Sequence, residues 1–122
     1  HSAFAYHIAL DNQAVDLGED QEARLYNDHV TSRWQRHFKH HEKIIWEVAV
    51  KLFPNNYSDV HPILPITLKP EQKIGFMLAY CDNDGSDTRE HFMGSHKIKP
   101  VDGDSNRGWI DANVFGNIIL KK

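Results

Sequence analysis

Residues 44–52, IIWEVAVKL, carry the clearest secondary-structure signal in the chain. In a β-strand every second side chain points to the same face of the sheet. That alternation places on one face the apolar side chains of Ile44, Trp46, Val48, Val50 and Leu52. The pattern therefore predicts a strand with Trp46 in the core.

Three other runs show the same period of two, at residues 4–10 (FAYHIAL), 73–81 (KIGFMLAYC) and 116–120 (GNIIL). Four prolines fall between residues 54 and 70 and exclude long regular elements there. Residues 33–43 show no clean helical period and are compatible with a short helical turn or a loop. Short strands separated by turn-rich segments are typical of an all-β fold. We expect one antiparallel β-sandwich domain over residues 1–122.

Composition excludes several classes of protein. The chain has 122 residues, of which 40% are hydrophobic and 25% charged, with a net charge of −3. That charge gives no basic footprint for nucleic acid. No apolar run approaches the roughly 20 residues of a membrane span. The single cysteine, Cys81, cannot form an internal disulfide, and its place in a strand pattern predicts a core residue rather than a reactive thiolate.

Trp109 is the first candidate for binding chemistry, because it directly follows the polar segment DGDSNRG at residues 102–108. An indole in a polar loop can stack on the C–H face of a pyranose, while Asn and Arg side chains read its hydroxyls. The alternative is that Trp109 caps the edge of the core. Composition alone does not separate the two.

Two other clusters carry metal-ligand chemistry. The segment DNDGSDTRE places four carboxylates around a glycine turn, an arrangement that suits calcium or, alternatively, a solvated hairpin turn: Asp82, Asp84, Asp87 and Glu90. Histidines 37, 40 and 41, with His29 upstream, have spacings compatible with zinc, but the segment lacks HExxH and favours a solvated loop: His29, His37, His40 and His41.

Three runs in order and register resemble family 9 carbohydrate-binding modules. The first is residues 46–50 (WEVAV), similar to the family's strand with a glutamate after its aromatic residue. The second is residues 68–84 (LKPEQKIGFMLAYCDND), followed by Arg89 and Glu90. The third is residues 109–120 (WIDANVFGNIIL), similar to the family's closing motif, with Ala112 where that motif often has proline.

The resemblance implies a jelly-roll-like sandwich that binds a poly- or oligosaccharide and has no catalytic activity. It implies a structural role for calcium and an extracellular, cell-surface or periplasmic location. It assigns Trp109 to one of two tryptophans that clamp a sugar, and it places further contacts at Asn106, Arg107, His7, Arg89 and Glu90. The turn carboxylates at 82, 84 and 87 are the candidate calcium ligands.

The chain resembles about the last two thirds of that domain, and neither Trp34 nor Trp46 takes the place of the other clamp tryptophan. We therefore expect either an incomplete sandwich or a trimmed relative, completed by a companion chain, a swapped partner or an upstream segment. Two alternative functions stay open. One is a sandwich-type interaction domain without sugar binding, and the other is a metal-dependent enzyme that uses the His37, His40 and His41 patch.

Overall fold

The fold was analysed in a computed structural model that describes residues 4–18, 20–37, 43–61, 63–82, 85–87 and 91–122. The regular structure in these ranges consists of antiparallel strands and two short 3₁₀ turns, which confirms the all-β prediction. The described chain divides into two compact units, Phe4–Thr67 and Leu68–Lys122. The sandwich arrangement of the sheets stays a prediction.

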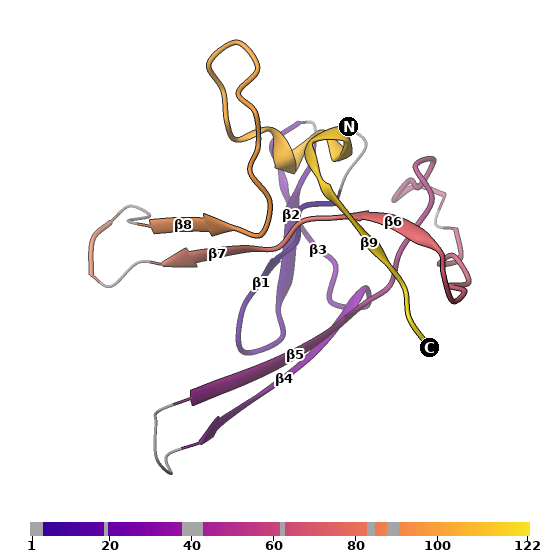
Figure 1. The fold of residues 1–122 in the computed structure, drawn as a ribbon, viewed down its shortest axis with the longest axis horizontal. Coiled ribbons are helices and arrows are strands. Elements are labelled where there is room, and N and C mark those ends of the chain that lie inside the picture. Colours follow the sequence, from indigo (N-terminus) through magenta and orange to yellow (C-terminus); the bar gives the residue numbers. More distant parts are fainter. Residues whose placement is uncertain (1–3, 19, 38–42, 62, 83–84, 88–90) are drawn as a thin grey trace. The chain divides into compact units, whose positions relative to one another are not determined.

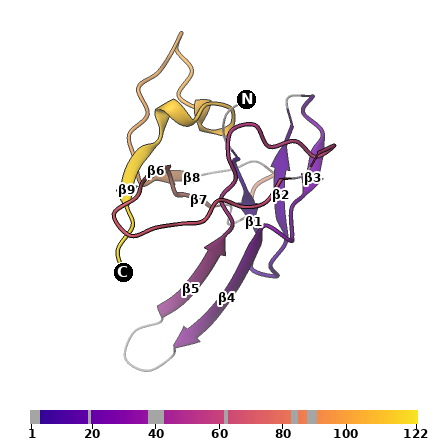
Figure 2. The ribbon, with the colours of Figure 1, turned by 90° about the vertical axis from the view of Figure 1, so that its right-hand side faces the viewer.

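The Phe4–Thr67 unit contains a small sheet and a long ribbon (Figure 1). The sheet pairs β1 (His7–Ile8), β2 (Ala14–Leu17) and β3 (Ala23–Leu25) in that order, and all three are visible in Figure 2. The ribbon pairs β4 (Val30–His37) with β5 (Lys43–Val50), with Trp34 directly opposite Trp46.

An aromatic cluster around His29 forms the core of this unit. The His29 side chain is only 3% exposed. Its ring lies 4.2 Å from that of Phe53 and 4.9 Å from that of Tyr26, measured between centroids. Three more rings, those of Phe4, Tyr6 and Tyr57, lie 5.3 to 5.9 Å away. The cluster joins the segments before β1, after β3 and after β5, so it fixes strands that are far apart in the sequence.

The Leu68–Lys122 unit is built from two more strand pairs (Figure 1). β6 (Lys73–Phe76) pairs with β9 (Gly116–Ile119), and β7 (Ala79–Asp82) pairs with β8 (His91–Gly94). Two 3₁₀ turns, η1 (Arg107–Trp109) and η2 (Ala112–Val114), precede β9. The pairing of β6 with β9 brings the two ends of the unit together.

The predicted strand over residues 73–81 is wrong in its extent, because it is two strands with different partners. The chain leaves the first pairing at Met77, and the Leu78 amide donates to Ser95 Oγ at 2.9 Å. The Ser95 amide in turn donates to the Leu78 carbonyl at 2.7 Å. A change of strand partner leaves no mark in the alternation of side chains.

The prediction for residues 33–43 is also corrected, because residues 33–37 continue β4. From Arg33 to His37 every side chain of this strand is exposed, so no apolar alternation marks it. The strand predicted over 4–10 contains only the two residues of β1 as regular structure. By contrast, β5 and β9 confirm the strands predicted over 44–52 and 116–120 within two residues.

Two predicted core residues lie at the surface. Trp46 is 38% exposed. Its neighbours on the same face of the ribbon are exposed too, Ile44 to 50% and Val48 to 39%. A ribbon of two strands is too narrow to cover the side chains on this face, so they stay exposed to solvent. Cys81 is also exposed, so its strand pattern did not indicate burial.

Candidate functional site

The candidate site of the Leu68–Lys122 unit lies on the loop that enters η1. A tight turn opens this loop, with Asp102 at φ 53° and Gly103 at φ 81°, a left-handed pair that suits an Asp-Gly sequence. Val101 and Asp104 close the turn by exchanging two backbone hydrogen bonds of 3.0 Å. The backbone N–H of Asn106 then donates a 2.7 Å hydrogen bond to the Asp104 carboxylate, which fixes the approach to η1.

Trp109 ends η1 and is half-buried. The preceding residue, Gly108, is buried, and a Cβ atom there would lie 2.8 Å from Met77 Cε and 3.6 Å from Phe115 Cε1. The turn is therefore packed closely against its own unit. The intermediate burial of Trp109 is compatible with both interpretations left open by the sequence, a residue at the edge of the core and a residue that a ligand can reach.

Asn106 and Trp109 are three residues apart across a 3₁₀ turn. Side chains at this spacing eclipse one another, because the turn has about three residues per revolution. Asn106 is the N-cap of η1, so this spacing favours, for its side chain, the side of the turn that carries the indole. The pairing of Asn106 and Trp109 assigned by resemblance is compatible with this geometry.

Two polar side chains within three residues of Trp109 in the sequence keep their hydrogen-bonding capacity. Asn106 is exposed, and its side chain makes no capping hydrogen bond to η1. Within the described residues, neither the Asn106 carboxamide nor the Arg107 guanidinium has a hydrogen-bond or ion-pair partner. An amide and a guanidinium supply donors and an acceptor that match the vicinal hydroxyls of a sugar.

The other predicted contact residues stay predictions. His7 is an exposed residue of β1, in the Phe4–Thr67 unit. Arg89 and Glu90 lie outside the described residues.

The metal predictions rest largely on residues that the structure does not describe. Asp84 lies outside the described residues, as does the side chain of Asp82, and Asp87 is an exposed residue. His40 and His41 also lie outside them, while His37 is exposed at the end of β4. Among the residues that are described, no group of three or more His, Cys, Asp or Glu gathers to hold a metal ion. The calcium site stays a prediction.

His29 belongs to the aromatic core and not to a histidine patch. Its Nδ1 lies 2.8 Å from the Tyr6 hydroxyl and its Nε2 lies 3.3 Å from that of Tyr57. Burial lowers the pKa of His29, with a smaller contribution from the positive charge of Lys51, while the nearby carboxylates of Asp28 and Asp59 act in the opposite direction.

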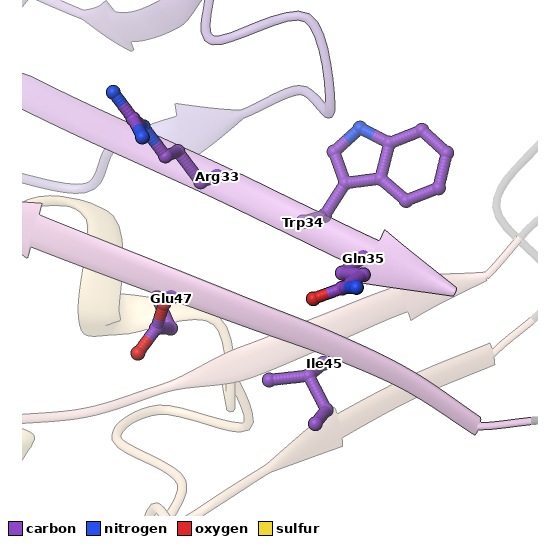
Figure 3. Close-up of a pocket in the computed structure, with 5 residues that line it drawn as sticks. All are labelled: Arg33, Trp34, Gln35, Ile45 and Glu47. Atoms are coloured by element: carbon purple, nitrogen blue, oxygen red, sulfur yellow. The ribbon is translucent and has the colours of Figure 1, made fainter. Parts of the chain in front are cut away.

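The β4–β5 ribbon carries a hollow that was not predicted from the sequence, lined by Arg33, Trp34, Gln35, Ile45 and Glu47 (Figure 3). Its polar residues come mainly from the part of β4 that resembles a loop in sequence. The one available signal is the opposite charge of Arg33 and Glu47, which is informative only once the register is known.

Comparison with protein families identifies the chain. The family model described as carbohydrate family 9 binding domain-like matches residues 1–122. The chain belongs to this family. No curated protein and no solved structure matches the chain.

Membership in the carbohydrate family 9 binding domain-like family confirms the resemblance carried by the three sequence runs. The first run lies in β5 and the second contains β6 and β7, and each of these strands is paired. The third run contains Trp109, η2 and β9. Among the described residues, no helix has the length and apolar character needed to cross a membrane.

Proposed function

We propose that this protein is a non-catalytic carbohydrate-binding module that recognises a poly- or oligosaccharide by stacking on Trp109. The proposal rests on the half-buried Trp109 of a chain in the carbohydrate family 9 binding domain-like family. Two polar side chains, those of Asn106 and Arg107, lie within three residues of it in the sequence and have no partners in the described structure. A covered indole is held rigid, so stacking loses little side-chain entropy. By family analogy the module acts outside the cell, on the cell surface or in the periplasm.

The polar residues give the site its orientation. Asn106 supplies a carbonyl oxygen and an amide group, and Arg107 supplies a fork of N–H donors. Each hydrogen bond to a sugar hydroxyl contributes about 1 kcal/mol, so removing either side chain weakens binding roughly fivefold. Removing the indole costs more, because stacking provides most of the apolar contact.

The first test is a titration of intrinsic tryptophan fluorescence with glucose, xylose, cellohexaose and xylohexaose, each with and without calcium. We expect a saturable change with at least one sugar. Because both substitutions remove the fluorescent indole, binding by these variants is followed by isothermal titration calorimetry. Trp109→Ala should lose the binding step that belongs to the η1 site, and Trp109→Phe should retain part of it, because a phenyl ring still stacks. Trp46→Phe, in the other unit, is the matched control and should bind as the parent does.

Two results would contradict the proposal. If Trp109→Ala loses its near-UV circular dichroism and unfolds, Trp109 is a core residue and the parent's response must be mapped by other variants. If the folded parent protein responds to no sugar, a protein-interaction domain becomes the better interpretation. That second function is favoured by the apolar face of the ribbon, where Ile44, Trp46 and Val48 are exposed.

A further inference from the structure

We infer that the β4–β5 ribbon carries a second carbohydrate-binding surface, which takes a segment of a neutral polysaccharide chain between Arg33 and Glu47. The inference rests on the proposed function and adds a site in the other unit, away from Trp109 in the sequence. Its evidence is the shape and chemistry of one face of the ribbon.

The register places Arg33 directly opposite Glu47 and Gln35 directly opposite Ile45. Side chains in such pairs start about 5 Å apart at Cβ, close enough for an ion pair. Even so, the Arg33 and Glu47 side chains extend away from one another, the first beyond β4 and the second beyond β5 (Figure 3). Neither has an ion-pair partner among the described residues.

The separation of these two side chains leaves a hollow of about 260 Å³. Gln35 lies over the gap between the strands and Ile45 lies on the far side of β5 (Figure 3). A second hollow of about 240 Å³ is also lined by Arg33 and Glu47, and its other lining residues include Thr31 and Ala49. Because both hollows share the same two residues, they adjoin along the ribbon.

The length and chemistry of this surface determine the ligand class. From Thr31 to Gln35 the strand advances roughly 14 Å, at about 3.4 Å per residue, so the surface is longer than one sugar ring. A guanidinium, a carboxamide and a carboxylate are planar groups that pair with vicinal hydroxyls. Ile45 adds apolar contact for the C–H faces of a sugar. Trp34 also lines the hollow, while the alternation of side chains places its indole on the face of the ribbon that carries Trp46, so it serves as a neighbouring reporter.

The charges favour a neutral chain. One guanidinium and one carboxylate share the hollow, so their net charge is zero. A uronic acid polymer carries a carboxylate on every unit, so a segment that spans the hollow would set carboxylates beside Glu47 as well as beside Arg33, and the repulsion would offset the attraction. A neutral glycan meets both groups as hydrogen-bond partners without repulsion. The absence of an internal partner for either group means that no ion pair has to be broken on binding.

The test is a titration of the full chain, labelled with ¹⁵N, with cellohexaose, xylohexaose and hexagalacturonate, followed by NMR. The three tryptophans give three indole N–H signals, so each site has its own reporter. We expect the Trp34 signal and the Gln35 side-chain amide signals to shift with a neutral hexasaccharide and to stay unchanged with hexagalacturonate.

Glu47→Gln and Arg33→Ala should each weaken the Trp34 response at least fivefold and leave the Trp109 response as it is. Glu22→Gln is the matched control, because it makes the same chemical change at an exposed position of the same unit outside the ribbon. It should leave both responses unchanged.

The outcomes separate this inference from the proposed function. If Trp109 responds and Trp34 does not, the ribbon surface is overturned while sugar binding at η1 stands. If Trp34 responds and Trp109 does not, the ribbon is the binding site and the η1 site falls. Silence of both signals in folded protein overturns both. Trp34 shifts that depend on protein concentration but not on sugar would make the ribbon a contact between copies of the chain and overturn the inference.

Discussion

At the scale of single residues, His29 makes the stability of the protein depend on pH. Burial lowers the pKa of His29, so the folded state binds its proton less readily than the unfolded state, where the pKa is about 6.5. Above about pH 6.5 both states hold a neutral imidazole and the contribution to stability is complete. As pH falls below 6.5, only the unfolded state gains the proton, and the free energy of unfolding decreases.

We therefore predict that urea unfolding at pH 5.5 requires less denaturant than at pH 7.5. His29→Gln should be less stable than the parent at pH 7.5 by about 1–3 kcal/mol, because Tyr6 and Tyr57 lose a partner. It should also lose most of the difference between the two pH values. The buried carboxyl of Asp16 has a pKa raised by burial and titrates in both proteins, so its effect cancels in the comparison. An equal pH dependence in both proteins would contradict the assignment to His29.

The aromatic cluster also shows which part of the core cannot be predicted from the sequence. The rings of Phe4 and Tyr6 belong to the alternating run at residues 4–10, whereas Tyr26 and Tyr57 lie in segments without regular structure, where alternation carries no information. His29 in sequence is one of several histidines, and only the packing distinguishes it. Local patterns predict which face of a strand is apolar, and they contain nothing about contacts between distant segments.

At the scale of elements, the turn before η1 depends on one glycine. Gly103 has φ 81°, in the left-handed region, and a Cβ there would meet nothing within 4 Å. Gly103→Ala therefore tests backbone strain without a clash, and we expect a loss of roughly 1–2 kcal/mol in the free energy of unfolding. Gly75→Ala in β6 is the control, because its Cβ would make an ordinary 3.9 Å contact with Phe115 Cβ. Equal destabilisation by both would show that the turn conformation is not the cause.

The elements also differ in how well sequence could predict them. β5 and β9 keep the apolar character of their alternating positions, and sequence places both. The outer part of β4 is exposed on both faces, so its polar residues resemble a loop until the pairing with β5 is known. The loop with Asn106 and Trp109 was predictable as a candidate site because its residues follow one another in the sequence. The hollow between Arg33 and Glu47 was not, because it depends on the pairing of two strands.

At the scale of the whole molecule, burial is distributed unequally between the two units. The buried apolar residues among those described, Ala14, Tyr26 and Val30, all belong to the Phe4–Thr67 unit, which also holds the His29 cluster. In the described part of the Leu68–Lys122 unit the large apolar side chains are half-buried or exposed, with Phe76 at 40% and Leu78 at 59%. Because burial of apolar surface is the main stabilising contribution, we expect the second unit to be the less stable one.

The tryptophans allow this difference to be measured, since Trp34 and Trp46 report on the first unit and Trp109 on the second. In the double variant Trp34→Phe and Trp46→Phe, fluorescence follows Trp109 alone, and in Trp109→Phe it follows the ribbon. We predict that the Trp109 signal changes at a lower urea concentration than the ribbon signal, so that unfolding is not two-state. Circular dichroism midpoints of the two variants control for destabilisation by the substitutions themselves. Coincident transitions would show instead that the two units unfold as one cooperative domain. In the same experiment with sugar added, a rise in the Trp109 midpoint alone would place sugar binding in the Leu68–Lys122 unit.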